Sequence, residues 1–330
     1  MTRIAVSLLL TLCIVFALGC LNAQPNIWQP SPGHTQIPIW PKEPPDAQPV
    51  TAPETVQTDH ENPVGGKPVS FVSNVSRPTM TVYSPKGNDT GVAVIVFPGG
   101  GYQALAIDLQ GTEICESLTS KGITGVLLKY RVPNSGPHRD ADIRDPNIPS
   151  QVEPKAPTAL EDAQRTVGLV RIHASDYHID PHKIGVLGFS AGGHLVADIS
   201  THFEKRLYPA VDAADKESCR PDFAVALYPG HLCNWPGHPC SNNSFELNPH
   251  IHVTKQTPPT LLLQAENDNV DPIDESLTYY IALKNAGVPV EMHLYAEGGH
   301  AFGIRRTKFP ITEWPQLVET WLKTIGMISE

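Results

Sequence analysis

The sequence lacks any block of basic residues and any repeat of fixed period. Its 330 residues carry a formal net charge of -10, with 24 Lys and Arg against 34 Asp and Glu. Nucleic acids and anionic membrane surfaces bind clustered positive charge, so neither is expected as a partner. Without a repeat, solenoid and propeller architectures are not expected either. The composition, 40% hydrophobic and 18% charged, is that of a folded globular protein.

Long apolar runs are also scarce, and the one at the N-terminus is short for a membrane span. Arg3 precedes the run from Ile4 to Leu18, and small residues follow it, as in a secretory signal. We therefore expect residues 1–23 to be a signal peptide and the protein to be periplasmic or secreted. The letters "ALGC" also resemble a lipoprotein box, which would leave a lipid anchor on Cys20. An uncleaved membrane anchor is the third alternative.

Cysteine is sparse, with six residues, two of them in the signal. Cys115 lies on a predicted helix among apolar residues and is expected to be buried. Cys219, Cys233 and Cys240 fall in a loop-rich region, where an oxidising compartment favours one disulfide, with Cys233–Cys240 the preferred pair. A metal site in "HLCNWPGHPC" is a weaker alternative, because structural zinc sites favour C-x-x-C spacings.

Proline is abundant, and many of the 33 residues lie before Pro98. Residues 24–68 are polar and proline-rich, which predicts an extended arm on a domain, or a disordered spacer. The catalytic domain is expected to span residues 69–330. There, unbroken apolar strands alternate with amphipathic helices, which predicts a mostly parallel central sheet with helices on both faces. Active sites of such sheets lie beyond the carboxyl ends of the strands.

The stretch "GFSAGG" follows one of these apolar strands. A bare G-x-S-x-G is a weak signal, but here Gly188 ends a strand and Ala191 opens a helix. A nucleophile on such a bend adopts a positive φ, and glycines two residues to either side avoid collisions. The helix N-terminus also directs N–H groups toward developing negative charge. We therefore predict that Ser190 is a nucleophile, against the alternative of a structural turn.

The run "FPGGGY" follows an earlier strand and is a candidate oxyanion loop. Consecutive glycines allow backbone N–H groups to turn toward one oxygen, and a tetrahedral oxyanion needs two or three such donors. We assign the N–H groups of Gly100, Gly101 and Ala191 to this role. The alternatives are a plain glycine turn and, less well supported, a phosphate loop, which would need different glycine spacing.

A serine nucleophile needs a base, and the base needs an orienting carboxylate. His300 follows the last predicted strand after a glycine pair, which selects it from 14 histidines as the base. For the acid, Asp268 leaves its strand first and is preferred over Asp271, with Asp274 further back. The order serine, acid, histidine is the one expected on this type of sheet.

From Val69 to Ile325 the chain resembles the α/β-hydrolase family, in particular bacterial acetyl esterases and acetyl-xylan esterases, a group with feruloyl-esterase-like members. The resemblance rests on "PGGGY", "LKYRVP", "DAQRTVGLVR", "IGVLGFSAGGHL", "PPTLLLQAENDNVDP", "NAGVPVEMHLY" and "GGHAFG". It implies the α/β-hydrolase fold with Ser190 as nucleophile, His300 as base and Asp268 as acid. The family acid loop usually reads D-x-x-V-P. Here the valine comes one place early, which keeps Asp271 as the alternative acid.

The resemblance implies an exported ester hydrolase that needs neither a metal nor an organic cofactor. Its expected partner is an acylated plant carbohydrate, or, as the alternative, another small ester. More remote hypotheses are a prolyl-oligopeptidase-like peptidase and a non-catalytic binding protein. The propeller of such peptidases would not fit before Val69, at about 40 residues a blade. Residues 133–156 and the cysteine-bearing segment 230–250 follow strand ends and are expected to form the pocket rim.

Overall fold

The computed structural model describes residues 27–47, 49, 52–132, 157–233, 240 and 245–329. The expected signal peptide with Cys20 and the first expected rim segment, 133–156, lie outside the described residues. Among the helices that the structure describes, none is long and apolar enough to cross a lipid bilayer.

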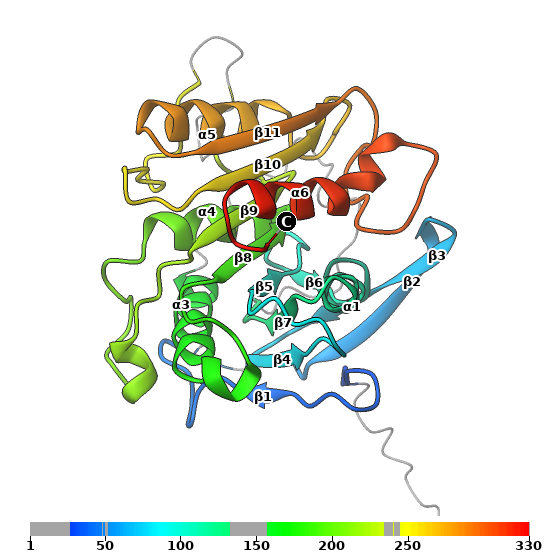
Figure 1. Ribbon diagram of the computed structural model, residues 1–330. Helices are drawn as coiled ribbons and strands as arrows, with labels where there is room; N and C mark the ends of the chain where they lie inside the picture. Colours follow the sequence, from blue (N-terminus) through cyan, green and yellow to red (C-terminus); the bar gives the residue numbers. More distant parts are fainter. Residues whose placement is uncertain are drawn as a thin grey trace, which may run out of the picture.

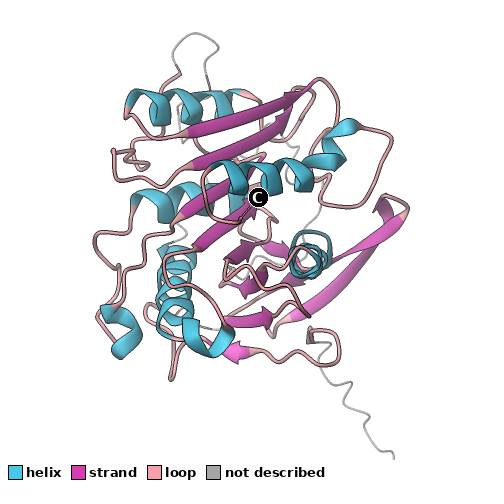
Figure 2. Cartoon of the chain, in the orientation of Figure 1, coloured by secondary structure: helices cyan, strands magenta, loops and turns pink. Residues whose placement is uncertain are grey.

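An eight-stranded sheet forms the centre of the domain (Figure 1; Figure 2). In spatial order its strands are β1 (Ile37–Pro38), β4 (Thr79–Tyr83), β7 (Thr124–Lys129), β5 (Ala93–Phe97), β8 (Ile184–Phe189), β9 (Phe223–Leu227), β10 (Thr260–Ala265) and β11 (Val290–Tyr295). The pairs β1–β4 and β4–β7 are antiparallel, and the other neighbours are parallel. The mostly parallel sheet predicted from the sequence is confirmed.

The parallel strands form because their residues are apolar without alternation. Every residue of β5, β8, β9 and β10 is buried. Such strands are stable only when both faces of the sheet are covered, which requires helical crossovers. The edge strand β11 is only partly buried, in keeping with its mixed sequence VEMHLY.

Helices cover both faces of this sheet. The α-helices are α1 (Glu113–Ser120), α3 (Pro157–Ile172), α4 (Ala191–Thr201), α5 (Asp274–Asn285) and α6 (Trp314–Thr324). A π-helical segment (Asp108–Thr112) precedes α1, and three short 3₁₀ helices are η2 (Ala174–Tyr177), η3 (Ala213–Lys216) and η4 (Pro310–Glu313). Leu187 of β8 faces α1 and α6, whereas the next residue, Gly188, packs on α4. Since successive strand residues point to opposite faces, the two sets of helices lie on opposite faces.

The part of the N-terminal arm that the structure describes lies on the domain and contributes strands of its own. Its strand β1 extends the central sheet, and β2 (Thr55–Val64) pairs with β3 (Lys67–Ser73) and, through β3, with β6 (Ala104–Ala106). Figure 1 shows the β2–β3 hairpin projecting beside α1. The sequence analysis expected no strand before Val69, because these polar segments lack the apolar alternation that indicates one.

Buried hydrogen bonds hold this arm in place. The indole Nε1 of Trp40 donates to Asp162 Oδ1 of α3 at 2.8 Å. Arg165 donates through Nε to the carbonyl of Ile39 at 2.9 Å, and Arg131 pairs with the Asp162 carboxylate at 2.9 Å. Asp162 and Arg165 of α3 therefore attach the arm to the fold.

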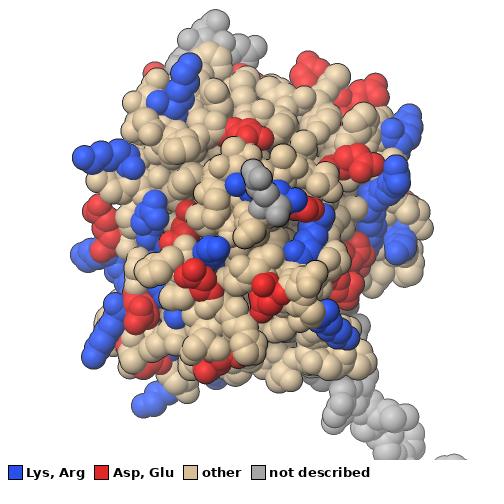
Figure 3. All heavy atoms as spheres, in the orientation of Figure 1, with Lys and Arg blue, Asp and Glu red and all other residues tan. Residues whose placement is uncertain are grey.

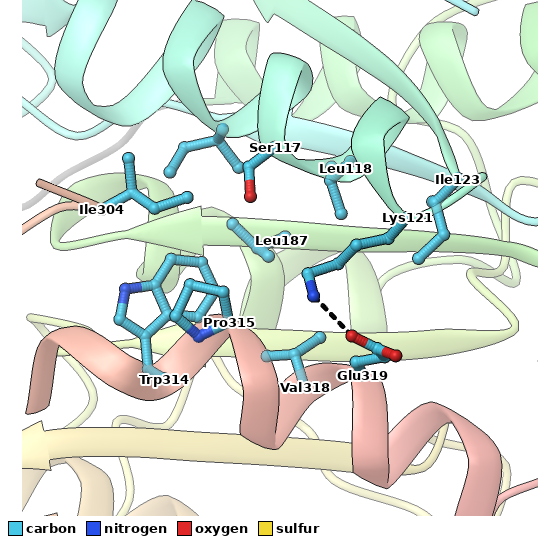
Figure 4. Close-up of a pocket in the computed structure, with 11 residues that line it drawn as sticks. Ser117, Leu118, Lys121, Ile123, Leu187, Ile304, Trp314, Pro315, Val318 and Glu319 are labelled. Carbon is cyan, nitrogen blue, oxygen red and sulfur yellow. Dashed lines mark hydrogen bonds and ion pairs between the residues drawn. The ribbon is translucent and has the colours of Figure 1, made fainter. Parts of the chain in front are cut away.

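A small apolar cavity lies between α1 and α6 (Figure 4). Its volume is about 10 Å³, and its walls include Leu187 and Trp314. The side chains of Lys121 and Glu319 form an ion pair beside it. A space of this size holds at most one water, so it is a packing gap and not a substrate pocket.

Charged side chains of both signs are intermixed on the face drawn in Figure 3. Neighbouring positive and negative charges cancel at a distance, so this face has no extended field of one sign.

Candidate active site

Ser190 lies at the turn between β8 and α4, at the carboxyl edge of the sheet. Its φ of +53° and ψ of -120° give the strained backbone that the sequence predicted. Its main-chain N–H donates to the carbonyl of Leu227 at 3.1 Å, which ties the turn to the neighbouring strand β9. The side chain is partly exposed and can therefore be reached from solvent.

The two glycines that flank Ser190 are required by close packing. A Cβ at Gly188 would lie 2.1 Å from the carbonyl oxygen of Gly192, and a Cβ at Gly192 would lie 2.1 Å from that of Phe97. The predicted collisions therefore occur with main-chain oxygens, which cannot move aside as a flexible side chain can. The G-x-S-x-G spacing is a packing requirement of this bend.

We expect Gly192→Ala to lower the free energy of unfolding by about 3 kcal/mol, because its Cβ would force the strand end and helix apart. Urea denaturation followed by circular dichroism measures the change. Gly287→Ala is the matched control, since its added Cβ meets nothing within 4 Å and bears only the positive-φ cost of about 1 kcal/mol. Equal losses in the two variants would contradict the packing argument.

A continuous chain of contacts joins Ser190 to a histidine and a carboxylate. His300 Nε2 lies 3.1 Å from Ser190 Oγ, and His300 Nδ1 lies 2.8 Å from Asp268 Oδ2. The loops after β10 and β11 bring Asp268 and His300 to the serine, since the carboxyl ends of parallel neighbours share one edge. The Asp268 side chain is fully buried and that of His300 is 15% exposed. The arrangement can transfer a proton from the serine to the imidazole.

A second carboxylate lies beside the same serine. The Ser190 hydroxyl donates to Asp271 Oδ2 at 3.3 Å, and that oxygen is 3.8 Å from His300 Nε2. Asp268 meets the far nitrogen of the ring and Asp271 the near one, so the two are not interchangeable. Of the two carboxylates, Asp268 has the position of the orienting acid of a triad, because it contacts the ring nitrogen that does not face the serine. Asp274 begins α5 and makes no contact with Ser190 or His300 among the hydrogen bonds and ion pairs of the described residues.

The two carboxylates act in the same direction on the imidazole. Burial lowers the pKa of His300, but the hydrogen bond to Asp268 and the charges of Asp271 and Asp268 outweigh it. The pKa of His300 therefore lies above the ordinary histidine value of 6.5. Burial also raises the pKa of the Asp271 carboxyl, against the opposing effects of His300 and His231.

The glycine loop lies next to the serine turn and is held by two side chains that the sequence analysis did not assign. Gln110 Oε1 accepts from the Gly99 N–H at 2.7 Å, and the Tyr130 hydroxyl donates to the Pro98 carbonyl at 2.6 Å. Gly100 has a φ of +135°, and its Cβ would lie 2.1 Å from the Ala104 carbonyl oxygen. The loop is therefore rigid before any substrate arrives.

The three N–H groups predicted for the oxyanion lie on this loop and on the first residue of α4. Within the part of the chain that the structure describes, the N–H groups of Gly100, Gly101 and Ala191 donate to no protein acceptor. They are available to a ligand, and their role in binding an oxyanion stays a prediction.

One further residue packs against the base and another holds a nearby loop, and no sequence signal distinguished either. The ring of Tyr228, at the end of β9, packs edge-on against His300 at 4.8 Å and against Phe302 at 4.6 Å. Glu275 of α5 is buried and accepts from the N–H groups of Leu232, at 2.6 Å, and of the following residue. Neither role could be predicted from the sequence, because the sequence does not show which strands and loops become neighbours.

His194 lies one turn into α4 and is a packing residue. The ring is buried, and its Nδ1 lies 2.7 Å from the hydroxyl of Tyr102 in the glycine loop. It thus supports the loop from below and is not the base.

The cysteines that the structure describes follow the sequence expectation. Cys233 and Cys240 form a disulfide with an S–S distance of 2.03 Å, so the alternative of a metal site in this segment is wrong. Thiols committed to a disulfide have no thiolate left to bind an ion. Cys115 and Cys219 are buried free thiols.

The fold agrees with comparisons to known sequences. The sequence profile of the prolyl oligopeptidase family, Peptidase_S9, matches residues 161–326. The chain belongs to this family of α/β-hydrolase domains. A second profile, BD-FAE, matches residues 80–229 and so covers the glycine loop and the nucleophile turn. The family resemblance inferred from the sequence motifs is confirmed.

Individual relatives are esterases and xylan-degrading enzymes. The chain is 27% identical over 268 residues to an acetylxylan esterase of Xylanibacter ruminicola, covering 78% of this chain and 51% of the relative. It is 28% identical over 227 residues to endo-1,4-beta-xylanase B of Butyrivibrio fibrisolvens, covering 66% and 33%. The chain thus spans about half, or less, of the length of these relatives.

A solved structure matches over nearly its full length. The acetyl ester-xyloside bifunctional hydrolase of Caldicellulosiruptor lactoaceticus is 30% identical, with a TM-score of 0.64, covering 89% of this chain and 97% of that one. Together these similarities place the domain among the carboxylic ester hydrolases.

Proposed function

We propose that this protein is an exported serine carboxylic ester hydrolase that removes acetyl, or similar acyl, groups from plant polysaccharide or oligosaccharide. The observation that carries the reaction type is the contact chain from Ser190 Oγ through His300 to Asp268. The names of the acetylxylan esterase and acetyl ester-xyloside hydrolase relatives support the substrate class. The apolar run after Arg3 supports export.

In the first half of the reaction, Ser190 Oγ attacks the carbonyl carbon of the ester. The proton of the hydroxyl passes to His300 Nε2, and Asp268 stabilises the imidazolium through Nδ1. The carbonyl oxygen of the ester becomes an oxyanion and accepts hydrogen bonds from the N–H groups of Gly100, Gly101 and Ala191. Loss of one such donor typically costs about 3 kcal/mol of transition-state stabilisation.

In the second half, His300 returns its proton to the sugar oxygen as the C–O bond breaks, which leaves an acyl-serine. A water molecule then loses a proton to His300 Nε2 and attacks the acyl carbon. Collapse of that intermediate returns the proton to Ser190 and releases the carboxylic acid. The residues of this chain supply the nucleophile, the proton transfers and the oxyanion donors.

Acetate release from acetylated xylo-oligosaccharides tests the substrate class. We expect the chain from residue 24 onward to release acetate with a kcat/KM of about 10⁴ M⁻¹ s⁻¹ or more, the ordinary range of enzymes on their own substrates. Enzyme-coupled acetate detection measures the rate, with 4-nitrophenyl acetate as a reporter of the triad alone.

Rates with different substrates separate the proposed function from three alternatives. Turnover of the reporter without acetate release from the oligosaccharides would retain the esterase and remove the xylan substrate. Cleavage of a dipeptidyl 4-nitroanilide in preference to both esters would replace the proposal with a peptidase. Inactivity toward all three substrates would favour a binding protein.

A further inference from the structure

A cluster of one carboxylate and two imidazoles lies at the far end of α4 from Ser190. Asp198 is two turns along the helix, His202 is the residue at its C-terminal end, and His250 comes from the loop before Ile251. At 1.5 Å per residue, Asp198 lies about 12 Å along the axis from the nucleophile. The cluster is therefore separate from the reacting atoms.

Asp198 carries a buried oxygen that no hydrogen bond satisfies. The residue is 2% exposed, and its Oδ1 has no hydrogen-bond partner within the described part of the chain. A carboxylate removed from water without a partner is costly, so it is protonated or is compensated by a cation.

The unsatisfied oxygen faces the two imidazoles at distances that suit a shared ion. Asp198 Oδ1 lies 3.7 Å from His202 Nδ1 and 3.5 Å from His250 Nε2. Each gap is long for a hydrogen bond. A tetrahedral ion bound at about 2.1 Å by each ligand places neighbouring ligand atoms about 3.4 Å apart. The two separations from Asp198 Oδ1 are close to this edge length, and all three ligand atoms lie within 4.8 Å of one another.

The two imidazole rings lie side by side. The rings of His202 and His250 stack with their centroids 4.5 Å apart. Neutral imidazole is the form that binds a metal ion.

Nδ1 of His202 has two contacts that it would exchange for the ion. His202 Nδ1 lies 3.0 Å from the main-chain carbonyl of Asp198 and 3.2 Å from the hydroxyl of Thr201. That carbonyl also accepts from the His202 N–H at 2.9 Å and from the Thr201 hydroxyl at 3.2 Å. The Asp198 carbonyl therefore keeps these two hydrogen bonds when the His202 ring turns its Nδ1 lone pair toward a metal.

Solvent can reach the cluster. The side chain of His250 is 59% exposed. His202 also lines a surface pocket of about 380 Å³ with Thr201, Lys205 and Leu207 among its walls. An ion can therefore enter without unfolding of the helix, and a water can complete its coordination.

We propose that Asp198, His202 and His250 bind a divalent transition-metal ion of the zinc class, with water in the fourth position. One carboxylate and two imidazoles are ligands that this class prefers. The ion attaches the loop that carries His250 to the end of α4. It takes no part in ester hydrolysis, so the proposal stands independently of the function given above.

Zinc titration of the tag-free, EDTA-treated chain tests this site. We expect one Zn²⁺ per chain by calorimetry and mass spectrometry, with a Kd below about 10 µM, and a higher unfolding temperature with zinc than with EDTA. Asp198→Asn and His250→Ala should each weaken zinc binding about 100-fold or more and remove the thermal shift. The exposed position of His250 makes its variant safe for folding.

His293→Ala is the matched control, because that ring also contacts a carboxylate, Glu291, at 2.7 Å. Unchanged zinc binding in this variant, with loss in the other two, supports the site. Absence of stoichiometric binding in the natural chain would overturn it. So would retained affinity in His250→Ala, or equal losses in all three variants, which would indicate non-specific binding to histidines.

Discussion

Replacing Ser190 with alanine is expected to reduce kcat for ester hydrolysis by about 10⁴- to 10⁶-fold, the usual cost of losing a serine nucleophile. Without Oγ, no acyl-enzyme can form, and water would have to attack the ester directly. The oxyanion donors on the glycine loop remain, so a small residual rate persists. Initial rates with 4-nitrophenyl acetate measure the loss.

The same variant should fold normally, because the hydroxyl donates to no main-chain group and the tight bend keeps its backbone contacts. Ser175→Ala, at an exposed turn, is the matched control and should retain full activity. An organophosphate ester that phosphorylates serine nucleophiles should label the natural chain and not Ser190→Ala. Turnover within tenfold of the natural rate in this variant would remove Ser190 from the mechanism.

Asp268→Asn is expected to lower kcat by about 10⁴-fold, as loss of the orienting carboxylate does in serine proteases. An amide in place of Asp268 Oδ2 cannot stabilise the imidazolium, and it can hold His300 in the wrong tautomer. The hydrogen bond at 2.8 Å to Nδ1 is the contact that changes. Steady-state kinetics across pH, with the unfolding midpoint as a check on folding, measure the effect.

Asp271→Asn is the matched comparison, since it removes an equal charge beside the same ring. The natural chain should show an acid limb of kcat/KM above pH 6.5, because His300 must be neutral to act as base and its pKa is raised. Loss of the Asp271 charge lowers that pKa, so the limb should move toward lower pH while most of the plateau kcat remains. A larger loss of kcat in Asp271→Asn than in Asp268→Asn would exchange the two roles.

The contacts of Ser190 in the free enzyme explain why Asp271 affects the pH dependence of the activity. The hydroxyl has one proton, which it donates either to His300 Nε2 or to Asp271 Oδ2. When it donates to Asp271, a protonated His300 can donate in turn to Ser190 Oγ. Asp271 therefore stabilises the charged, inactive form of the base, and its removal should favour the neutral form.

Local patterns in the sequence were sufficient to predict the central sheet and the bend that carries Ser190. Unbroken apolar runs specify strands that must be covered on both faces. The glycines at Gly188 and Gly192 specify a bend with no room for a Cβ. The strand pattern depends on neighbouring residues in the chain, and the glycines are recognised by their spacing around Ser190, so the sequence predicted both directly. The order of strands also directed attention to the loops after β10 and β11.

Other features depend on which distant segments become neighbours, and only the tertiary structure decided them. Asp268 and Asp271 leave the same strand three residues apart, and only folding shows that one meets Nδ1 of His300 and the other Nε2. The segment that forms β2 is polar, and it becomes a strand only because it pairs with β3. The spacing of Asp198 and His202 on α4 gave no signal until the loop with His250 packed beside it. The sequence gives the chemistry of each side chain, but the distances between residues far apart in the chain are set by tertiary packing.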